Sequence, residues 1–523
     1  MRRLALALAL LAACAAAGWS EEALSPFESA APLETRNKID SLVFARLRRL
    51  GVQPARPCSD AVFLRRAYLD VTGTLPTALE ARTFLLDPDP GKRQALVERL
   101  LEREEFADYR ALKWCDLLRV KSEFPINLWP NGVQAYHHWI RDSIRRNVPY
   151  DRFARELLTA SGSNFRVPPV NFYRAVQSRE PQALAQAVAL AFMGVRPAAW
   201  PKERWEGMGG FFAQVGYKYT KEWKEEILFF DPGKPAAKAI FPDGKPARPA
   251  PGQDPRAAFA DWLITPENPW FTRNIANRVW SWLLGRGIIH EADDIRPDNP
   301  PGHPELLALL ERDLITARYD LKRLFRLILN SQTYQLSSVP RTPGPEAQAA
   351  FASYLPRRLE AEALIDALCQ ITGTSERYSS PIPEPFTYVP EENRSIALAD
   401  ASISSPFLET FGRPPRDTGL ESERNNLPSA EQRLYLLNSS HLRGKIEGLA
   451  GVLRRPAARG GFPAAQRGDP RQDLNELYLM ILSRFPTDEE ARSVLDYVQS
   501  AGQGAGVDVV WALINSSEFQ YRH

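Results

Sequence analysis

Apolar residues recur at helical spacing along most of the chain. Within residues 39–50 an apolar stripe ends at Gly51, and Ser59 stands immediately before the next stripe. Spacings of three and four residues place side chains on one face of an α-helix, so we predict a mainly α-helical protein. Ser59 and Thr77 are expected to cap helices. After a break in the helical pattern, helices resume at Ala257. Further helices are expected at residues 93–104, 106–119, 134–146, 150–160, 182–195, 269–284, 304–315, 320–331, 357–372, 429–449, 472–484, 488–500 and 507–517.

The break in the helical pattern divides the chain. Residues 229–256 are rich in Pro, Gly and Lys and contain the turn signal Asp243-Gly244. Such composition is typical of a linker. We therefore predict two multi-helix domains, at residues 35–228 and 257–523, with a small β-hairpin in the linker around residues 239–241.

A second irregular stretch follows within the later domain. Residues 374–427 are long, polar and Pro-rich and show no helical periodicity. A segment of this length is either a functional loop or only partly ordered. Both interpretations remain open at this point.

Two short patterns occur twice. Pro76-Thr77-x-x-Glu80 returns as Pro486-Thr487-x-x-Glu490, and Asn330-Ser331-x-x-Tyr334 is echoed by Asn515-Ser516-x-x-Phe519. The Thr-x-x-Glu spacing predicts a capping box. The echo indicates either capping boxes that simply resemble each other or a helical-hairpin module used twice.

The N-terminus predicts export. Arg2 and Arg3 precede the apolar run of residues 4–13, which is too short to span a bilayer, and residues 1–20 are therefore expected to be a signal peptide. Leu11-Ala12-Ala13-Cys14 has the form of a lipobox, so we predict lipidation at Cys14 and a membrane-anchored lipoprotein of the periplasm or outer surface. The alternative is ordinary cleavage near residues 15–17.

Cysteine usage and charge exclude several classes of protein. The four cysteines are single, with no CxxC, CxxCH or Cys/His cluster, which argues against structural zinc, iron–sulfur and covalent haem sites. We expect no cofactor and no metal. Loss of Arg2 and Arg3 leaves 64 basic against 63 acidic residues, a net charge of about +1. That balance does not indicate a nucleic-acid partner.

The densest polar stretch follows the helix expected at 269–284. A His and several carboxylates on one loop are the residue types that acid–base catalysis uses, although salt bridges at a helix end use them equally. The candidate catalytic residues are His290, Glu291, Asp293, Asp294 and His303. The candidate binding residues are Arg278, Arg286, Glu360, Arg424 and Asn425.

Tryptophans offer another candidate surface. Most tryptophans at helical spacing belong to the core, but in an exported protein they also form sugar-stacking platforms. The residues in question are Trp129, Trp262, Trp270, Trp280 and Trp282.

Several of these motifs together resemble two paired bacterial families. The earlier part of the chain resembles the planctomycete-specific cytochrome-like domain, and the later part resembles the planctomycete-specific domain. The earlier motifs are Ile39-Asp40-x-x-Val43, Leu64-Arg65-Arg66-x-x-x-Asp70-Val71-Thr72-Gly73-x-x-Pro76-Thr77 and Pro149-Tyr150-Asp151-x-Phe153. The later motifs are Ala260-Asp261-Trp262-Leu263, Asn277-Arg278-Val279-Trp280, Gly285-Arg286-Gly287, His303-Pro304-Glu305-Leu306, Arg358-Leu359-Glu360-Ala361-Glu362, Leu436-Leu437-Asn438-Ser439 and Asn515-Ser516-Ser517-Glu518-Phe519.

The resemblance implies an exported protein whose biochemistry is unassigned. Many members of the family carry a CxxCH stretch ahead of a tryptophan and a Phe-Phe-Ala segment. Here residues 196–201 occupy that position without cysteine or histidine, ahead of Trp205 and Phe211-Phe212-Ala213. We therefore expect a member without the haem motif.

Three functions follow as hypotheses. The first is a binding or scaffold protein of the cell envelope, with exported proteins or a polysaccharide as partners and the membrane reached only through an N-terminal lipid. The second is a hydrolase acting on polysaccharide, and the third is an electron-transfer protein with a non-covalent cofactor.

Overall fold

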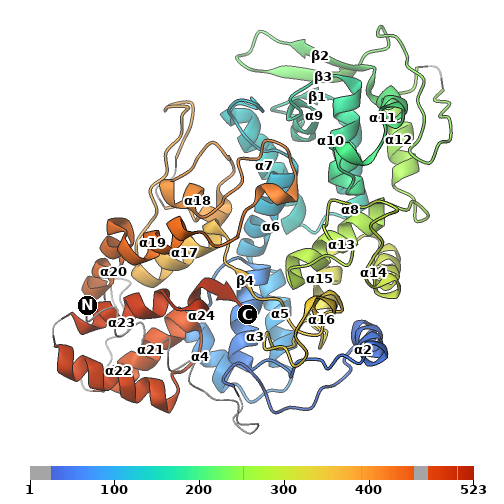
Figure 1. Ribbon diagram of the computed structural model, residues 1–523. Coiled ribbons are helices and arrows are strands. Elements are labelled where there is room, and N and C mark those ends of the chain that lie inside the picture. Colours follow the sequence, from blue (N-terminus) through green and yellow to red (C-terminus); the bar gives the residue numbers. More distant parts are fainter. Residues whose placement is uncertain (1–24, 251, 390–391, 453–468, 503) are drawn as a thin grey trace.

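The computed structural model describes residues 25–250, 252–389, 392–452, 469–502 and 504–523, and it confirms the predicted mainly α-helical fold (Figure 1). The predicted signal peptide and Cys14 lie outside the described residues. The longer helices are α2 (Lys38–Leu50), α3 (Asp60–Val71), α4 (Ala78–Leu86), α5 (Lys92–Leu101), α6 (Glu104–Leu117), α7 (Pro130–Arg145), α8 (Tyr150–Thr159), α10 (Pro181–Met193), α11 (Lys202–Gly209), α12 (Pro255–Leu263), α13 (Phe271–Leu284), α14 (Pro304–Thr316), α15 (Leu321–Leu329), α17 (Ala361–Thr372), α19 (Ala430–Asn438), α20 (Ser440–Val452), α21 (Pro470–Leu482), α22 (Asp488–Ala501) and α23 (Ala505–Ile514).

The predicted helix boundaries follow from local chemistry. Gly51 ends α2 in the left-handed conformation with φ 66°, which glycine adopts without a Cβ penalty. The Ser59 side chain accepts a hydrogen bond from the Val62 N–H and begins α3. Thr77 forms the predicted capping box with Glu80 and begins α4.

One predicted helix is divided, and another begins late. The helix expected at 429–449 is interrupted because the Ser439 side chain accepts hydrogen bonds from the N–H groups of His441 and Leu442 and starts α20 anew. The helix expected from 357 begins only at Ala361. The first two residues of the expected range form strand β4 (Arg357–Arg358) instead, which pairs antiparallel with β5 (Tyr521–Arg522) and so joins distant parts of the chain.

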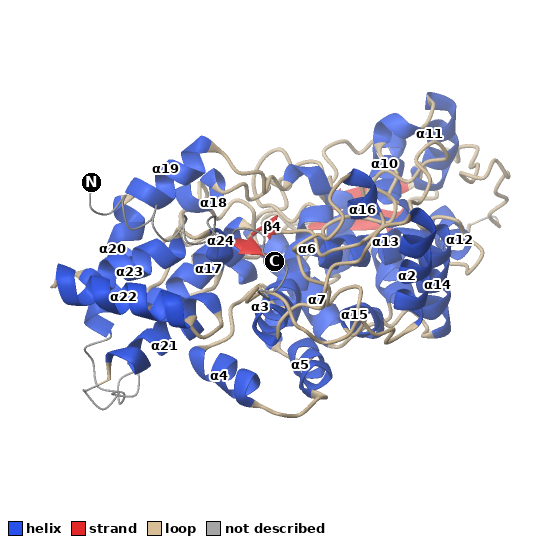
Figure 2. Ribbon diagram, turned by 60° about the horizontal axis from the view of Figure 1, so that its bottom comes forward, coloured by secondary structure: helices blue, strands red, loops and turns tan. Residues whose placement is uncertain are grey.

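Strands are few and lie in two small groups (Figure 2). β2 (Val215–Tyr219) and β3 (Glu226–Phe230) form an antiparallel hairpin, and β1 (Gly162–Ser163) pairs with the other edge of β3. This hairpin precedes a second, smaller one at the position predicted around residues 239–241. There Ile240 bridges Pro246 antiparallel, and the N–H groups of Phe241 and Ala247 donate to the carbonyl oxygens of Lys245 and Ala239, both at 2.9 Å.

The core consists of two large apolar clusters. One contains buried residues between Ile39 and Tyr354, together with Ala399 and Leu479. Its members therefore lie on both sides of the expected linker. The other joins residues 359–519 to Leu69 and Leu75 of the early chain. The division of the core falls near residue 355, where the chain crosses between the clusters.

The irregular stretch at 374–427 packs against the helices. It contains short helical turns at Ser395–Ala397, α18 (Pro406–Thr410) and Glu421–Glu423. The Asp366 carboxylate of α17 accepts hydrogen bonds from the N–H groups of Ser395 and Ile396 at 2.6 and 3.0 Å. Side-chain contacts of this kind hold a segment that has no periodicity of its own.

Candidate functional site

The loop after α13 carries the carboxylates predicted as catalytic groups. Asp293 is buried, and its Oδ1 lies 2.6 Å from Nη2 of Arg196. Its Oδ2 accepts a hydrogen bond from the Glu421 N–H at 3.1 Å. Glu291 pairs with the same Arg196 guanidinium. Arg196 therefore holds two carboxylates of this loop in place.

The other groups of this loop do not share a site with Asp293. Asp294 pairs with Nε of Arg296 at 3.0 Å, and His290 is exposed. Partial burial, aided by the positive charge of Arg286, lowers the pKa of His290. His290 therefore stays neutral at neutral pH and lies on the surface.

His303 is a helix cap. Its buried ring accepts a hydrogen bond at Nδ1 from the Leu306 N–H at 3.4 Å and begins α14. Nε2 lies 3.2 Å from the Leu42 carbonyl oxygen, to which it donates in the same neutral tautomer. Burial lowers the pKa of His303. Both ring nitrogens of this predicted catalytic residue therefore form structural hydrogen bonds with the backbone.

Arg278 lies fully buried on α13 and binds Glu421. Its Nη1 is 2.9 Å from Oε2 of Glu421, whose Oε1 accepts a hydrogen bond from Nε1 of Trp282 at 2.7 Å. Arg278 also donates to the Leu190 carbonyl oxygen at 3.0 Å. Burial raises the pKa of Glu421, against the attraction of Arg278. This predicted binding residue anchors the irregular stretch to α13.

Glu360, just before α17, lies among cationic groups. Its Oε2 accepts a hydrogen bond from the Tyr109 hydroxyl at 2.7 Å, its Oε1 pairs with Lys113, and Nη2 of Arg522 is 3.7 Å away. Burial alone would raise the pKa of Glu360, but Lys113 and Arg522 hold it well below its ordinary value. Burial lowers the pKa of Lys113 to about 8. The Glu360 carboxylate is therefore ionised, and each of its oxygens has a partner.

Arg424 joins α6 to α17. Its Nη2 lies 2.7 Å from Oδ2 of Asp116, and its Nη1 lies 2.6 Å from Oε2 of Glu362. Arg416 contacts the second oxygen of Asp116 at 2.8 Å, and Arg413 lies 3.6 Å from Glu362. All of these side chains are largely buried. The neighbouring Asn425 is exposed and only stabilises a turn, because its Oδ1 accepts from the Leu427 N–H.

These contacts form two neighbouring groups, one around Glu360 and one around Asp116 and Glu362, which we together call the central charge cluster. Its carboxylates are all paired, so none is left as a proton donor or metal ligand. Among the described residues no group of three or more His, Cys, Asp or Glu side chains is placed to hold a metal ion. The central charge cluster comprises Lys113, Asp116, Glu360, Glu362, Arg413, Arg416, Arg424 and Arg522.

A different arrangement lies on the surface, where three chain segments meet. Trp129 precedes α7, Trp223 lies in the turn between β2 and β3, and Phe386 lies in the irregular stretch. The ring centroid of Trp129 is 6.4 Å from that of Trp223 and 5.6 Å from that of Phe386. The Lys224 ammonium lies 4.9 Å from the Trp129 ring and 5.4 Å from the Trp223 ring. We call these four residues the aromatic–lysine patch.

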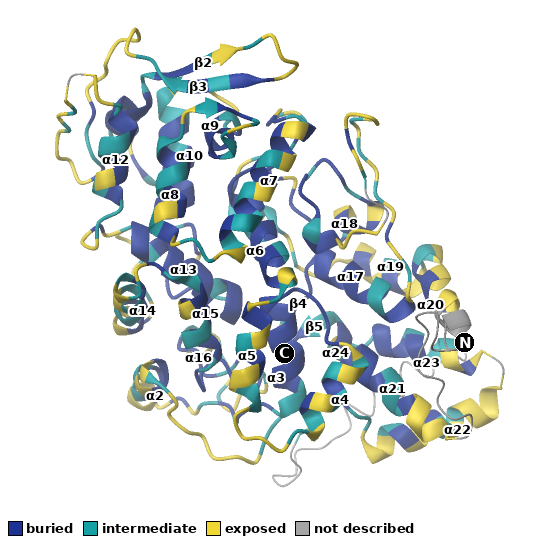
Figure 3. Ribbon diagram, turned by 180° about the vertical axis from the view of Figure 1, so that it is seen from behind, coloured by how far each residue is buried: buried dark blue, intermediate teal, exposed yellow. Residues whose placement is uncertain are grey.

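The patch is exposed and its backbone is strained. Trp223 and Phe386 retain 69% and 50% exposure, and Figure 3 shows the β2–β3 turn among the exposed parts. Trp129 and Lys224 have φ angles of 68° and 58°, a region that bulky side chains rarely adopt. Of the other predicted tryptophans, Trp280 and Trp282 are buried in the core. Trp262 and Trp270 are half-buried, with ring centroids 5.9 Å apart.

Comparison with known proteins places the chain among uncharacterised families. Residues 38–197 match the model PSCyt2, a protein of unknown function (DUF1549), and residues 255–498 match PSD1, a protein of unknown function (DUF1553). The chain carries a DUF1549 domain followed by a DUF1553 domain. No curated protein and no solved structure matches it.

The central charge cluster lies between these two domains. Lys113 and Asp116 belong to the DUF1549 domain, whereas Glu360, Glu362 and Arg424 belong to the DUF1553 domain. These paired charges, together with the apolar core that both domains share, hold one domain against the other. Among the described residues no helix is both long and apolar enough to cross a membrane.

Part of this site could not be anticipated from the sequence. Glu360, Arg278 and Arg424 were predicted, and each lies in a buried polar network. The motifs did not indicate Lys113, the partner of Glu360, or Asp116, the partner of Arg424. Their signal was weak: two charged side chains within the apolar stretch from Ala111 to Leu118. Three arginines were also missed, and no motif distinguishes them: Arg413, Arg416 and Arg522.

Proposed function

We propose that this DUF1549–DUF1553 protein is an exported, lipid-anchored binding protein of the cell envelope, with a polysaccharide as its ligand. The observation that carries the proposal is the aromatic–lysine patch. Exposed aromatic groups on a soluble protein mark interaction sites, and an indole offers a flat apolar surface for the apolar face of a sugar ring. Strained backbone persists where the surrounding structure maintains it, often at ligand sites.

The charges around the patch indicate the class of polysaccharide. Lys218, Lys221 and Lys224 are exposed in and beside the β2–β3 turn, together with Tyr219, which is 72% exposed. Ammonium groups attract carboxylate or sulfate groups, whereas the core of a protein–protein interface is depleted of lysine. The patch therefore fits an acidic sugar chain better than a protein partner.

The interior supports a binding role over a hydrolytic one. A glycoside hydrolase needs two carboxyl groups that flank one bond, one of them free to carry a proton. Asp293 and Glu291 are tied to Arg196, and Glu360 is tied to Lys113. His303 caps a helix. Asp293 and Glu291 share Arg196 and Asp294 pairs with Arg296, so each of these candidate acids is held by an arginine.

Export and anchoring rest on the sequence of the N-terminus. The lipobox around Cys14 predicts acylation of its thiol, which would place the protein at the membrane through lipid alone. Labelling of cells with radioactive palmitate tests this expectation. We expect label in the wild-type protein and none in the Cys14→Ser variant, and an unlabelled wild-type protein would contradict anchoring.

Native gels that contain polysaccharide test the ligand. We expect polygalacturonate or alginate to retard the wild-type protein, with less retardation at high salt because salt screens exposed charges. Neutral dextran should have little effect. Equal migration in all gels would contradict the proposal, and retardation by a single-stranded oligonucleotide alone would indicate a different ligand.

Matched variants locate the binding surface. Trp223→Ala removes an exposed ring from the patch, whereas Leu79→Ala removes an equally exposed apolar side chain, 73% exposed, from α4. We expect Trp223→Ala to migrate freely and Leu79→Ala to be retarded like the wild type. Both should unfold at the wild-type temperature, because neither side chain is buried.

A further inference from the structure

A buried arginine inside the DUF1549 domain has no anionic partner. Arg110 of α6 is 2% exposed, and its guanidinium carbon lies 4.4 Å from the Tyr109 ring centroid, 5.3 Å from that of Phe325 and 5.8 Å from that of Trp282. Its Nη2 donates a hydrogen bond to the Asp70 carbonyl oxygen at 2.7 Å. Among the described residues Nε and Nη1 have no partner, and no carboxylate oxygen lies within 4.0 Å.

The nearest acidic groups are already neutralised. The Asp70 carboxylate lies 3.0 Å from Arg357 and 3.1 Å from Arg522, and Glu360 pairs with Lys113. Buried charges in proteins are normally paired, because an isolated charge in a low-dielectric interior is costly. Desolvation lowers the pKa of Arg110, which is consistent with this cost. Glu360 and Asp70 attract the guanidinium at longer range and so oppose this lowering of its pKa, but neither carboxylate pairs with it directly.

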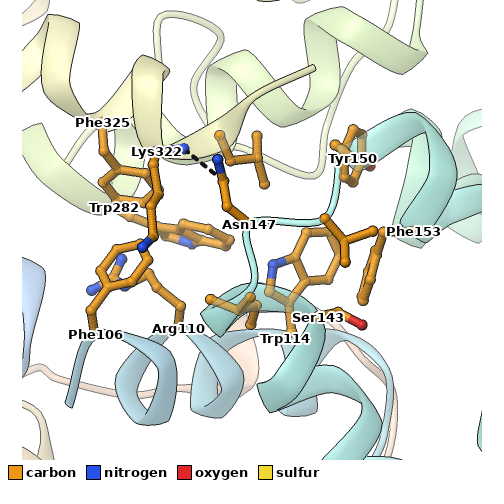
Figure 4. Close-up of a pocket in the computed structure, with 13 residues that line it drawn as sticks. Phe106, Arg110, Trp114, Ser143, Asn147, Tyr150, Phe153, Trp282, Lys322 and Phe325 are labelled. Atoms are coloured by element: carbon orange, nitrogen blue, oxygen red, sulfur yellow. Dashed lines mark hydrogen bonds between the residues drawn. The ribbon is translucent and has the colours of Figure 1, made fainter. Parts of the chain in front are cut away.

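A cavity of about 30 Å³ lies beside this arginine (Figure 4). Six aromatic residues line it, and they come from both domains. Tyr150 is one of them, and its hydroxyl is buried without a hydrogen-bond partner among the described residues. A buried water molecule needs a cavity volume of about 10–15 Å³. The cavity is therefore large enough for one halide ion or about two water molecules. The lining aromatic residues are Phe106, Trp114, Tyr150, Phe153, Trp282 and Phe325.

We propose that this cavity binds a single monovalent anion of halide size. The unpaired N–H groups of Arg110 supply both the charge and the donors. Water would satisfy the donors but would leave the charge unpaired. The volume excludes a phosphate or a sugar acid, so this site is distinct from the proposed polysaccharide surface.

Bromide identifies the occupant directly. Crystals of the full chain grown in sodium bromide should show an anomalous peak at the bromine edge, in the cavity and at hydrogen-bonding distance from Arg110. Ordinary water density there without an anomalous signal would overturn the proposal. This measurement uses the wild-type protein and so does not depend on whether any variant folds.

Thermal unfolding provides a second measurement. A ligand that binds only the folded state raises the melting temperature with its concentration. We expect a higher melting temperature in sodium chloride than in sodium gluconate at equal ionic strength, since gluconate is too large for the cavity. Arg110→Met should abolish the difference. Arg119→Met should keep it, because Arg119 is likewise buried with an unpartnered N–H but does not line the cavity. Equal temperatures in both salts would contradict the proposal.

Discussion

Arg65 and Arg66, adjacent on α3, hold two copies of the same turn. Arg65 donates to the Phe519 carbonyl oxygen at 2.8 Å, and Arg66 donates to the Tyr334 carbonyl oxygen at 2.6 Å. In each turn a serine accepts from the N–H of that aromatic residue: Ser516 at 3.2 Å and Ser331 at 3.1 Å. The repeated sequence pattern therefore corresponds to one local structure that occurs twice. The helix α3 donates a hydrogen bond to each copy.

Removal of one of these arginines should destabilise the protein. Arg66 is buried and donates to three carbonyl oxygens, of Tyr334, Leu336 and His523. Arg66→Met leaves these acceptors unsatisfied, and we expect a loss of about 3 kcal/mol in the free energy of unfolding. Urea denaturation measures it. Arg49→Met, at an exposed position of α2, should change stability by less than about 0.5 kcal/mol.

The contact between the two domains depends on Arg424. Arg424→Met would leave Asp116 and Glu362 with less cationic compensation in a buried environment. Breaking a buried ion pair in this way costs about 3–5 kcal/mol. Calorimetry should show a lower melting temperature. Arg443→Met breaks the exposed pair with Glu447 and should cost no more than about 0.5 kcal/mol, so equal losses in the two variants would contradict a structural role for Arg424.

Acid should destabilise the fold through His137. Burial, aided by the positive charge of Arg416, lowers the pKa of His137 to about 3, whereas an unfolded histidine titrates near 6.5. Between these values the unfolded state binds a proton that the folded state does not. Stability therefore falls as the pH drops below 6.5, by about 1.4 kcal/mol per pH unit.

Carboxyl groups whose pKa is raised in the folded state oppose this trend, so the comparison needs a variant. Burial raises the pKa of Asp366 to about 6, which favours the folded state as the pH falls toward 4. His137→Gln should flatten the loss of stability between pH 7 and 4.5 relative to the wild type. His138→Gln, at the exposed neighbouring position, should keep the wild-type slope, and a parallel curve for His137→Gln would refute the assignment.

Helices and caps were accessible from the sequence because they depend on neighbours along the chain. Thr77 and Thr487 both form the predicted capping boxes. In each case one arginine joins the box to a second glutamate: Arg103 binds Glu80 and Glu105, and Arg484 binds Glu490 and Glu518. The similarity of the two patterns thus extends beyond the caps themselves.

Long-range contacts were not accessible. The aromatic–lysine patch requires Trp129, Trp223 and Phe386 to meet, and they are separated by 94 and 163 residues along the chain. Asp116 and Arg424 are likewise 308 residues apart. The carboxylates after α13 looked catalytic because their residue types suit acid–base chemistry. Only the arrangement in space shows that arginines hold them.

Titration calorimetry of an acidic oligosaccharide into the full chain tests the central claim most directly. Oligogalacturonate should bind the wild-type protein, and Trp223→Ala should weaken binding at least tenfold at an unchanged melting temperature. Lys224→Ala should weaken binding at low salt and approach the wild type at high salt. Wild-type affinity in the Trp223→Ala variant would contradict the account, as would an absence of binding to the wild-type protein.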